Sequence, residues 1–175
     1  MTQLRALRAD ITTLQTDAIV NAANETLPGA RGVGGGMPRA GGPELLAACR
    51  KLPELRPGVR CETGQARITP GFRLAARYVI HTVGPVWQGG GEAEAQLLAS
   101  CYANAVTLAA EHAVRELAFP AISCGVYRFP KAEACRIAVE TLRSLAQPAL
   151  ASVYLVAFDL EMFELWQAAL EDSSR

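Results

Sequence analysis

The sequence predicts an α/β fold, a sandwich in which helices pack on a largely parallel sheet. Short continuous apolar runs at residues 18–21 and 117–122 are typical of buried parallel strands. Segments with one apolar face fall between such runs, and residues 92–113 form the clearest of them, without glycine or proline. Because strands and helices alternate along the chain, we expect a single α/β domain spanning residues 1–175.

Each element follows from a local pattern. Residues 4–8 are the predicted first strand, and residues 10–12 form a turn. Residues 43–52 are a predicted helix, because proline suits the first helical position and the basic residues 50 and 51 suit its negative end. The other predicted elements are strands at 65–69, 77–83 and 152–158 and helices at 133–146 and 161–171. The connectors are compatible with one or two antiparallel strands.

The composition is that of an ordinary globular protein, with 50% hydrophobic and 19% charged residues. There is no signal-peptide pattern and no apolar run of membrane-spanning length, so we expect a cytoplasmic protein without a membrane partner. The net charge is zero, which makes nucleic acid an unfavourable partner. Residues 1–80 carry 11 of the 17 basic side chains and 6 of the 17 acidic ones, which suits a small anionic ligand. We expect a monomer.

The cysteines indicate reduced thiols rather than disulfides or a metal site. Their number is odd, no CxxC pair occurs, and only two histidines are present as further ligands. The five are Cys49, Cys61, Cys101, Cys124 and Cys135. We therefore predict no metal and no cofactor.

Two glycine-containing loops follow predicted parallel strands. Residues 21–42 hold seven glycines, which would expose backbone amides to an anion or simply form a surface loop. Residues 123–127 follow the strand predicted at 117–122. Because ligands of such sheets bind beyond the carboxyl ends of the strands, the two loops could hold a diphosphate from two sides.

Common nucleotide and hydrolase motifs are absent. No GxxxxGK[ST] loop occurs, and Gly32-Val33-Gly34 does not continue as GxGxxG. Ser123 stands in no GxSxG elbow, although a triad assembled in space stays open.

Four sequence blocks stand in order and cover nearly the whole chain. They are DIT at 10–12, DAIVNAAN at 17–24, YVIHTVGPVW at 78–87 and AFPAISCGVY at 118–127. With this spacing the chain resembles the macrodomain family, specifically its MacroD-type branch. The resemblance implies a three-layer α/β/α fold around a mixed six-stranded sheet. It implies as partners ADP-ribose, O-acetyl-ADP-ribose and ADP-ribosylated proteins, from which relatives remove acetyl or ADP-ribose groups.

The resemblance also assigns residues. Asp10, with Ile11 beside it, would accept a hydrogen bond from the adenine amine, or would only form a turn. Asn24 would hold the distal ribose, whereas Asn21 is expected to be structural. Phe158 would stack on the adenine or belong to the core. The first phosphate loop would consist of Gly32, Val33, Gly34 and Gly35, and Arg31 would contact the diphosphate or project into solvent. The second phosphate loop would consist of Ser123, Cys124, Gly125, Val126 and Tyr127, and the ring of Tyr127 would pack on the distal ribose. The strand histidine His81 is expected to be a core residue.

The chain departs from the family pattern at two positions. The family's catalytic aspartate falls on Gly34 and a histidine falls on Pro38. Loss of a general base typically lowers the rate 10²- to 10⁴-fold, so we expect slow hydrolysis. In this case Asn24 would position the water and a phosphate of the ligand would activate it. The alternative is a protein that binds ADP-ribose without turnover. Glu25 is the nearest carboxylate in sequence. The glycines and Pro38 predict a loop over 32–42, with the helix starting near Pro43.

Overall fold

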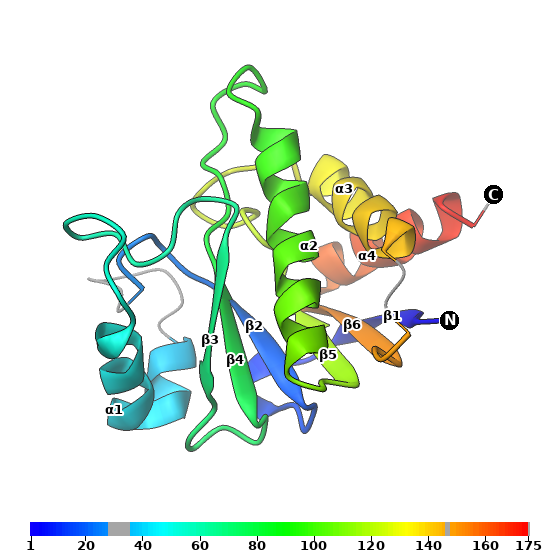
Figure 1. Ribbon diagram of the computed structural model, residues 1–175. Helices are drawn as coiled ribbons and strands as arrows, with labels where there is room; N and C mark the ends of the chain where they lie inside the picture. Colours follow the sequence, from blue (N-terminus) through cyan, green and yellow to red (C-terminus); the bar gives the residue numbers. More distant parts are fainter. Residues whose placement is uncertain (28–35, 146–147, 175) are drawn as a thin grey trace.

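A computed structural model describes residues 1–27, 36–145 and 148–174 of the chain. Within these residues a six-stranded sheet is covered by helices on both faces (Figure 1). The strands are β1 (Gln3–Arg8), β2 (Ala18–Ala22), β3 (Ala66–Pro70), β4 (Tyr78–Thr82), β5 (Glu116–Phe119) and β6 (Ser152–Ala157). The helices are η1 (Ile11–Thr13), α1 (Gly36–Lys51), α2 (Glu94–Glu111), α3 (Lys131–Ser144) and α4 (Leu160–Asp172).

The strand order in the sheet is β1-β6-β5-β2-β4-β3. All neighbouring pairs are parallel except β3 and β4, which are antiparallel. The predicted fold class, a mixed but largely parallel sheet, is therefore confirmed. As a consequence, the carboxyl ends of five strands meet at one edge of the sheet.

Each face of the sheet has its own apolar core. Ala18 and Val20 pack with residues of α2, α3 and α4, whereas Ile19 packs on the opposite face with Leu45 of α1. Buried β2 therefore lies between two helical layers, as its continuous apolar run predicts. Trp166 of α4 is fully buried on the sheet. No helix in the described part of the chain is long and apolar enough to span a membrane.

Helix α1 corrects one prediction. It begins at Gly36, within the segment predicted as loop, although a break at Gly42 (φ 78°, ψ −176°) separates it from the second half that begins at Pro43. Met37 in the first half is buried against the core, and this tertiary packing overrides the low helix propensity of glycine. Gly42 favours glycine because its positive φ of 78° is strained for a residue with a side chain. Residues 32–35 of the predicted loop lie outside the described residues.

Strand β5 is shorter than predicted and ends at Phe119. Pro120 follows directly and has no N–H to donate to a neighbouring strand. Residues 120–122 therefore belong to the loop that continues to Tyr127, which lengthens the connection at the carboxyl end of β5.

At the opposite edge of the sheet, Asp17 forms hydrogen bonds with the residues at the starts of two neighbouring strands. Its Oδ2 accepts hydrogen bonds from the backbone N–H groups of Arg115 (2.8 Å) and Glu116 (3.1 Å) at the start of β5. Its Oδ1 lies 3.5 Å from the Arg77 guanidinium, and its carbonyl accepts the N–H of Tyr78 at the start of β4. One residue thus aligns the beginnings of β2, β4 and β5.

We predict that Asp17→Ala lowers the free energy of unfolding by about 2 kcal/mol, because two backbone donors lose a charged acceptor. Urea denaturation measures the change. Arg77→Ala is the matched control, since it removes the exposed ion pair and the contact with the Tyr78 ring but leaves both hydrogen bonds from the backbone N–H groups in place, and it should cost less than about 1 kcal/mol. Equal stability of the Asp17→Ala and Arg77→Ala proteins would contradict this role.

Candidate functional site

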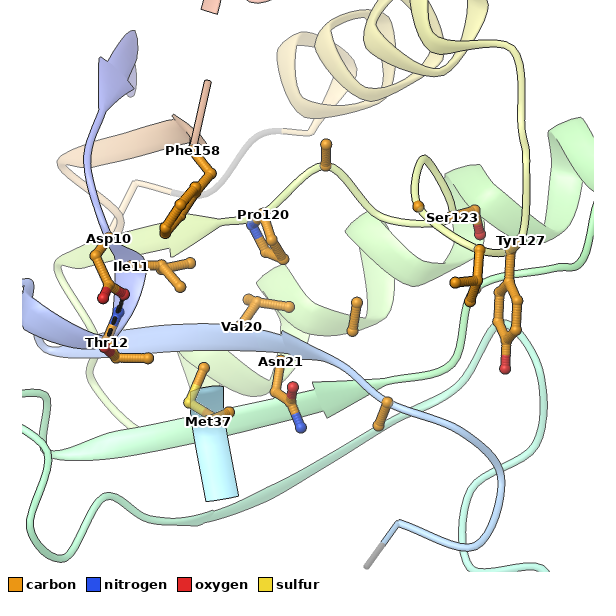
Figure 2. A pocket seen from close by; sticks show the side chains of 16 residues that line it. Asp10, Ile11, Thr12, Val20, Asn21, Met37, Pro120, Ser123, Tyr127 and Phe158 are labelled. Carbon is orange, nitrogen blue, oxygen red and sulfur yellow. Dashed lines mark hydrogen bonds between the residues drawn. The ribbon is translucent and has the colours of Figure 1, made fainter. Parts of the chain in front are cut away.

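A cleft of about 320 Å³ lies at the sheet edge where the parallel strands end (Figure 2). Its walls come from the residues at or just after the carboxyl ends of β1, β6, β5, β2 and β4. The lining residues are Asp10, Ile11, Thr12, Val20, Asn21, Ala22, Ala23, Met37, Gly84, Pro120, Ala121, Ser123, Gly125, Val126, Tyr127 and Phe158. The cleft is mostly apolar, and Asp10 is the single carboxylate among these residues.

Asp10 and Phe158 lie at one end of the cleft, after the neighbouring strands β1 and β6. Asp10 is exposed and caps η1, with Oδ1 accepting hydrogen bonds from N (3.0 Å) and Oγ1 (2.7 Å) of Thr12. Its Oδ2 has no partner among the described residues and is available to a ligand. The turn role and the ligand role considered for Asp10 are therefore compatible.

Phe158 is not a core residue, because 81% of it is exposed. It belongs to the cleft wall and leaves a ring face accessible beside Asp10 and Ile11 (Figure 2). An exposed aromatic ring next to a free carboxylate oxygen can recognise a flat base that carries an amino group.

Residues 123–127 form the other end of the cleft. Ser123 has a left-handed backbone (φ 64°), is buried, and its Oγ has no hydrogen-bond partner in the described part of the chain. The N–H groups of Gly125 and Val126 likewise have no acceptor within residues 1–27, 36–145 and 148–174. Successive free amides in such a turn form an anion-binding concavity.

Gly84, directly behind this loop, permits the close approach of β4 and the loop. A Cβ at Gly84 would lie 2.1 Å from Oγ of Ser123 and 2.6 Å from Cγ2 of Ile122. Tyr127 is held by its carbonyl, which accepts the N–H of Trp87 at 2.9 Å. The segment after β4 therefore fixes the position of the loop after β5.

Two residues to which the family resemblance gave a ligand-binding role, Asn24 and Cys124, do not line the cleft. Asn24 is half-buried just beyond β2, and its Oδ1 accepts a hydrogen bond from Oγ1 of Thr26 at 2.7 Å. Cys124 turns its backbone N–H to the carbonyl of Ala121, and burial raises the pKa of its thiol to about 11. Cys124 is therefore a neutral thiol near pH 7. Arg31, Gly32, Val33, Gly34 and Gly35 lie outside the described residues.

Glu25, considered as a substitute base, faces another part of the molecule. Its Oε1 accepts a hydrogen bond from Oγ1 of Thr63 at 3.2 Å, and its Oε2 lies 4.0 Å from Arg56. It does not line the cleft. Among the described residues, no three histidine, cysteine or acidic side chains are grouped as metal ligands would be.

His81 is a buried core residue, as predicted, but it is connected to the cleft. It is 1% exposed, and its Nδ1 lies 3.1 Å from Nδ2 of Asn21. Its Nε2 lies 2.9 Å from Oγ1 of Thr69 and 3.6 Å from Sγ of Cys49. Burial lowers the pKa of His81 to about 4, so the ring is neutral near pH 7.

Several lining residues were not predicted from the sequence. Met37 reaches the cleft through the unexpected first half of α1, and Asn21 was expected to be structural. Gly84 and Pro120 follow the ends of β4 and β5, so the rule that ligands bind at carboxyl ends could have found them, whereas Val20 is the middle residue of β2. From the sequence, this rule was applied to the two glycine-containing loops alone.

An α/β sandwich with an elongated cleft across the ends of its parallel strands is a small-molecule-binding architecture. The sequence of residues 20–138 matches the model of the Macro domain family, so the chain belongs to this family.

Similar proteins cover almost the whole chain. A macro domain-containing protein of Ralstonia nicotianae is 54% identical over 97% of this chain and 95% of its own length. A protein of Cronobacter sakazakii named O-acetyl-ADP-ribose deacetylase is 46% identical over 96% of this chain and 93% of its own length. A mutant Oceanobacillus iheyensis macrodomain with ADPR has a TM-score of 0.90 and 39% identity, covering 98% of this chain and 93% of that structure.

We predict that His81 makes folding stability depend on pH between about 4 and 6.5. In this window the unfolded chain binds a proton at His81 that the folded chain does not, so stability decreases as the pH falls, by about 3 kcal/mol over the window. Below pH 4 the folded chain also binds it, and the effect stops growing.

Urea denaturation of the native protein and His81→Gln at several pH values measures this contribution. The difference in stability between the two should shrink as the pH falls from 6.5 to 4. His112→Gln, at the half-buried second histidine, is the control. The stability of this variant should still decrease between pH 6.5 and 4, as in the native protein. A constant difference between native protein and His81→Gln would contradict the prediction.

Proposed function

We propose that this chain binds ADP-ribose in the cleft and slowly hydrolyses ADP-ribose esters. The substrates are O-acetyl-ADP-ribose, which loses acetate, and proteins carrying ADP-ribose on acidic side chains. The observation that carries the proposal is the combination of groups along the cleft: a free carboxylate oxygen and an exposed ring at one end, and free amides at the other.

The adenine is assigned to the end formed by Asp10 and Phe158. Oδ2 of Asp10 accepts a hydrogen bond from the exocyclic amine, and the ring of Phe158 covers one face of the base. Ile11 supplies apolar contact. Both polar and apolar demands of adenine are thereby met by residues that follow adjacent strands.

The diphosphate is assigned to the amides of Gly125 and Val126, with the hydroxyl of Ser123 as a further donor. No lysine or arginine lines the cleft among the described residues, so the anion is bound mainly by backbone dipoles. Gly32, Val33, Gly34 and Gly35 form the other phosphate loop in this proposal, with Arg31 contacting the diphosphate or solvent. Tyr127 packs against the distal ribose.

Asn24 is proposed to position the attacking water, which a phosphate oxygen of the ligand activates in the absence of an aspartate at position 34. Oδ1 of Asn24 accepts the hydrogen bond from Thr26, and its Nδ2 has no partner among the described residues and is available to the ligand or the water. The relative named O-acetyl-ADP-ribose deacetylase supports hydrolysis. Gly34 favours the second candidate function, a reader that binds ADP-ribose without turnover.

We predict that Asp10→Ala and Asp10→Asn each weaken ADP-ribose binding about tenfold, because the adenine amine loses its acceptor. Asp10→Asn is the sharper variant, since asparagine can still cap η1 and should preserve stability. Isothermal titration calorimetry measures the affinities.

Inosine diphosphate ribose provides the matched control, because its base carries a carbonyl where adenine carries the amine. Asp10→Asn should bind this analogue better than the native protein does. Unchanged ADP-ribose affinity in both Asp10 variants would show that the adenine assignment is wrong.

We predict slow release of acetate from O-acetyl-ADP-ribose by the native protein and a 10²- to 10⁴-fold faster release by Gly34→Asp. Product formation followed by chromatography measures both, and a substrate ADP-ribosylated on glutamate is assayed in parallel. Tight ADP-ribose binding without any turnover by the native protein would reject the enzyme and establish the reader.

A further inference from the structure

We propose that Arg128 is a specificity-determining residue, which contacts acidic residues on either side of an ADP-ribosylated side chain in a protein substrate. The inference rests on the proposed function and deepens it, because it assigns the part of the substrate that extends beyond the distal ribose.

The backbone of Arg128 has a conformation that does not favour arginine. Its φ of 58° is left-handed, and its N–H donates to the carbonyl of Gly125 at 2.9 Å, which closes a turn over residues 125–128. Glycine adopts a left-handed backbone without strain, whereas a residue with a side chain seldom does. The turn itself therefore gives no reason for an arginine at this position, and a function of the side chain supplies one.

The guanidinium of Arg128 carries a positive charge that no neighbour neutralises. The residue is exposed and forms no ion pair or side-chain hydrogen bond within residues 1–27, 36–145 and 148–174. Lys131, at the start of α3, is by contrast paired with Glu161 at 3.0 Å. The carboxylate of Asp10 lies at the other end of the cleft (Figure 2). The charge of Arg128 is therefore available to an anionic group of a partner.

Arg128 stands where a protein substrate leaves the cleft. Asp10 and Tyr127 lie at opposite ends of the cleft (Figure 2), and Arg128 follows Tyr127 directly. In the proposed function Tyr127 packs on the distal ribose, and this ribose carries the ester. An acetyl group extends little beyond the ester, whereas a protein chain continues across the surface next to Arg128. The residue therefore acts on protein substrates and not on O-acetyl-ADP-ribose.

Two exposed valines lie beside the same end of the cleft. Val126 lines the cleft and is 64% exposed, and Val86 is 44% exposed. Val86 is close to this loop, because the N–H of the next residue, Trp87, donates to the carbonyl of Tyr127 at 2.9 Å. A peptide can cover apolar surface on both valines while its carboxylates pair with Arg128. Val86, Val126 and Arg128 thus form one exit surface for the peptide.

The chemistry of the guanidinium selects acidic peptides. Arginine binds a carboxylate through two parallel N–H donors. The ADP-ribosylated side chain has itself lost its charge in the ester, so the carboxylates that pair with Arg128 belong to neighbouring residues of the peptide. An exposed ion pair of this kind changes affinity by about two- to fivefold. The exit surface therefore contributes selectivity among protein substrates rather than tight binding.

Fluorescence polarisation with two labelled peptides tests the contact. Each peptide carries ADP-ribose on one central residue through a linkage that does not hydrolyse, so that binding is measured whether or not the protein is an enzyme. One peptide has aspartates on both sides of this residue, and the other has serines. The native protein should bind the aspartate peptide about three- to fivefold more tightly, and added salt should reduce this preference.

Arg128→Gly is the deciding variant, and it should stay folded because glycine suits the left-handed backbone. It should bind both peptides equally, while its affinity for ADP-ribose alone changes less than about twofold. Arg128→Gln is the second variant. Arg50→Gln removes another exposed charge, in the last turn of α1, and as the matched control should keep the preference.

Three results would overturn the role of Arg128. One is a preference that persists in both Arg128 variants, and another is a preference that Arg50→Gln also removes, since net charge would then explain it. The third is an equal loss of affinity for both peptides and for ADP-ribose alone, which would assign Arg128 to the diphosphate.

The result for the native protein separates the two levels of inference. If the native chain does not bind ADP-ribose at all, the proposed function fails and the Arg128 proposal fails with it. If the native chain binds ADP-ribose and treats the two peptides alike, only the Arg128 proposal fails.

Discussion

The parallel pairing of five strands is the constraint on which the rest of the structure depends. It brings the ends of β1, β6, β5, β2 and β4 to one edge, so that residues far apart in sequence share a single cleft. Asp17 aligns the opposite edge through the backbone of β5 and the start of β4. The register in turn sets His81 beside Asn21. Packing, polar contacts and the cleft therefore all follow from one strand arrangement.

The cleft divides recognition between backbone and side chains. The proposed anion-binding part of the cleft consists of amides positioned by the turn at Ser123 and by the close contact with Gly84, and these do not depend on any one side chain. In the proposed function, discrimination between ligands depends on side chains that follow strands, such as Asp10. Binding can therefore persist in a chain with glycine at position 34, since the amides and the adenine contacts are independent of a catalytic aspartate.

Much of the fold could be predicted because its signals are local. Apolar runs marked the buried strands, and alternation with helices indicated the parallel sheet. The start of α1 could not be predicted, because burial of Met37 against the core stabilises the helix more than the neighbouring glycines destabilise it. This packing involves residues far away in the sequence, so the local pattern does not indicate it. The same holds for Asn21, whose place in the cleft depends on strand register. Asp10 and Phe158 were found through family resemblance and the loop at 123–127 through its place after a parallel strand. The structure brings Asp10, Phe158 and this loop, except Cys124, to one cleft, and their contacts with a ligand stay predictions.

A crystal structure of the protein with ADP-ribose tests the central claim most directly. We expect the adenine between Asp10 and Phe158, the diphosphate on the amides of Gly125 and Val126, and the distal ribose beside Asn24 and Tyr127. A ligand bound in the reverse direction, or outside the cleft at the ends of the parallel strands, would contradict this account.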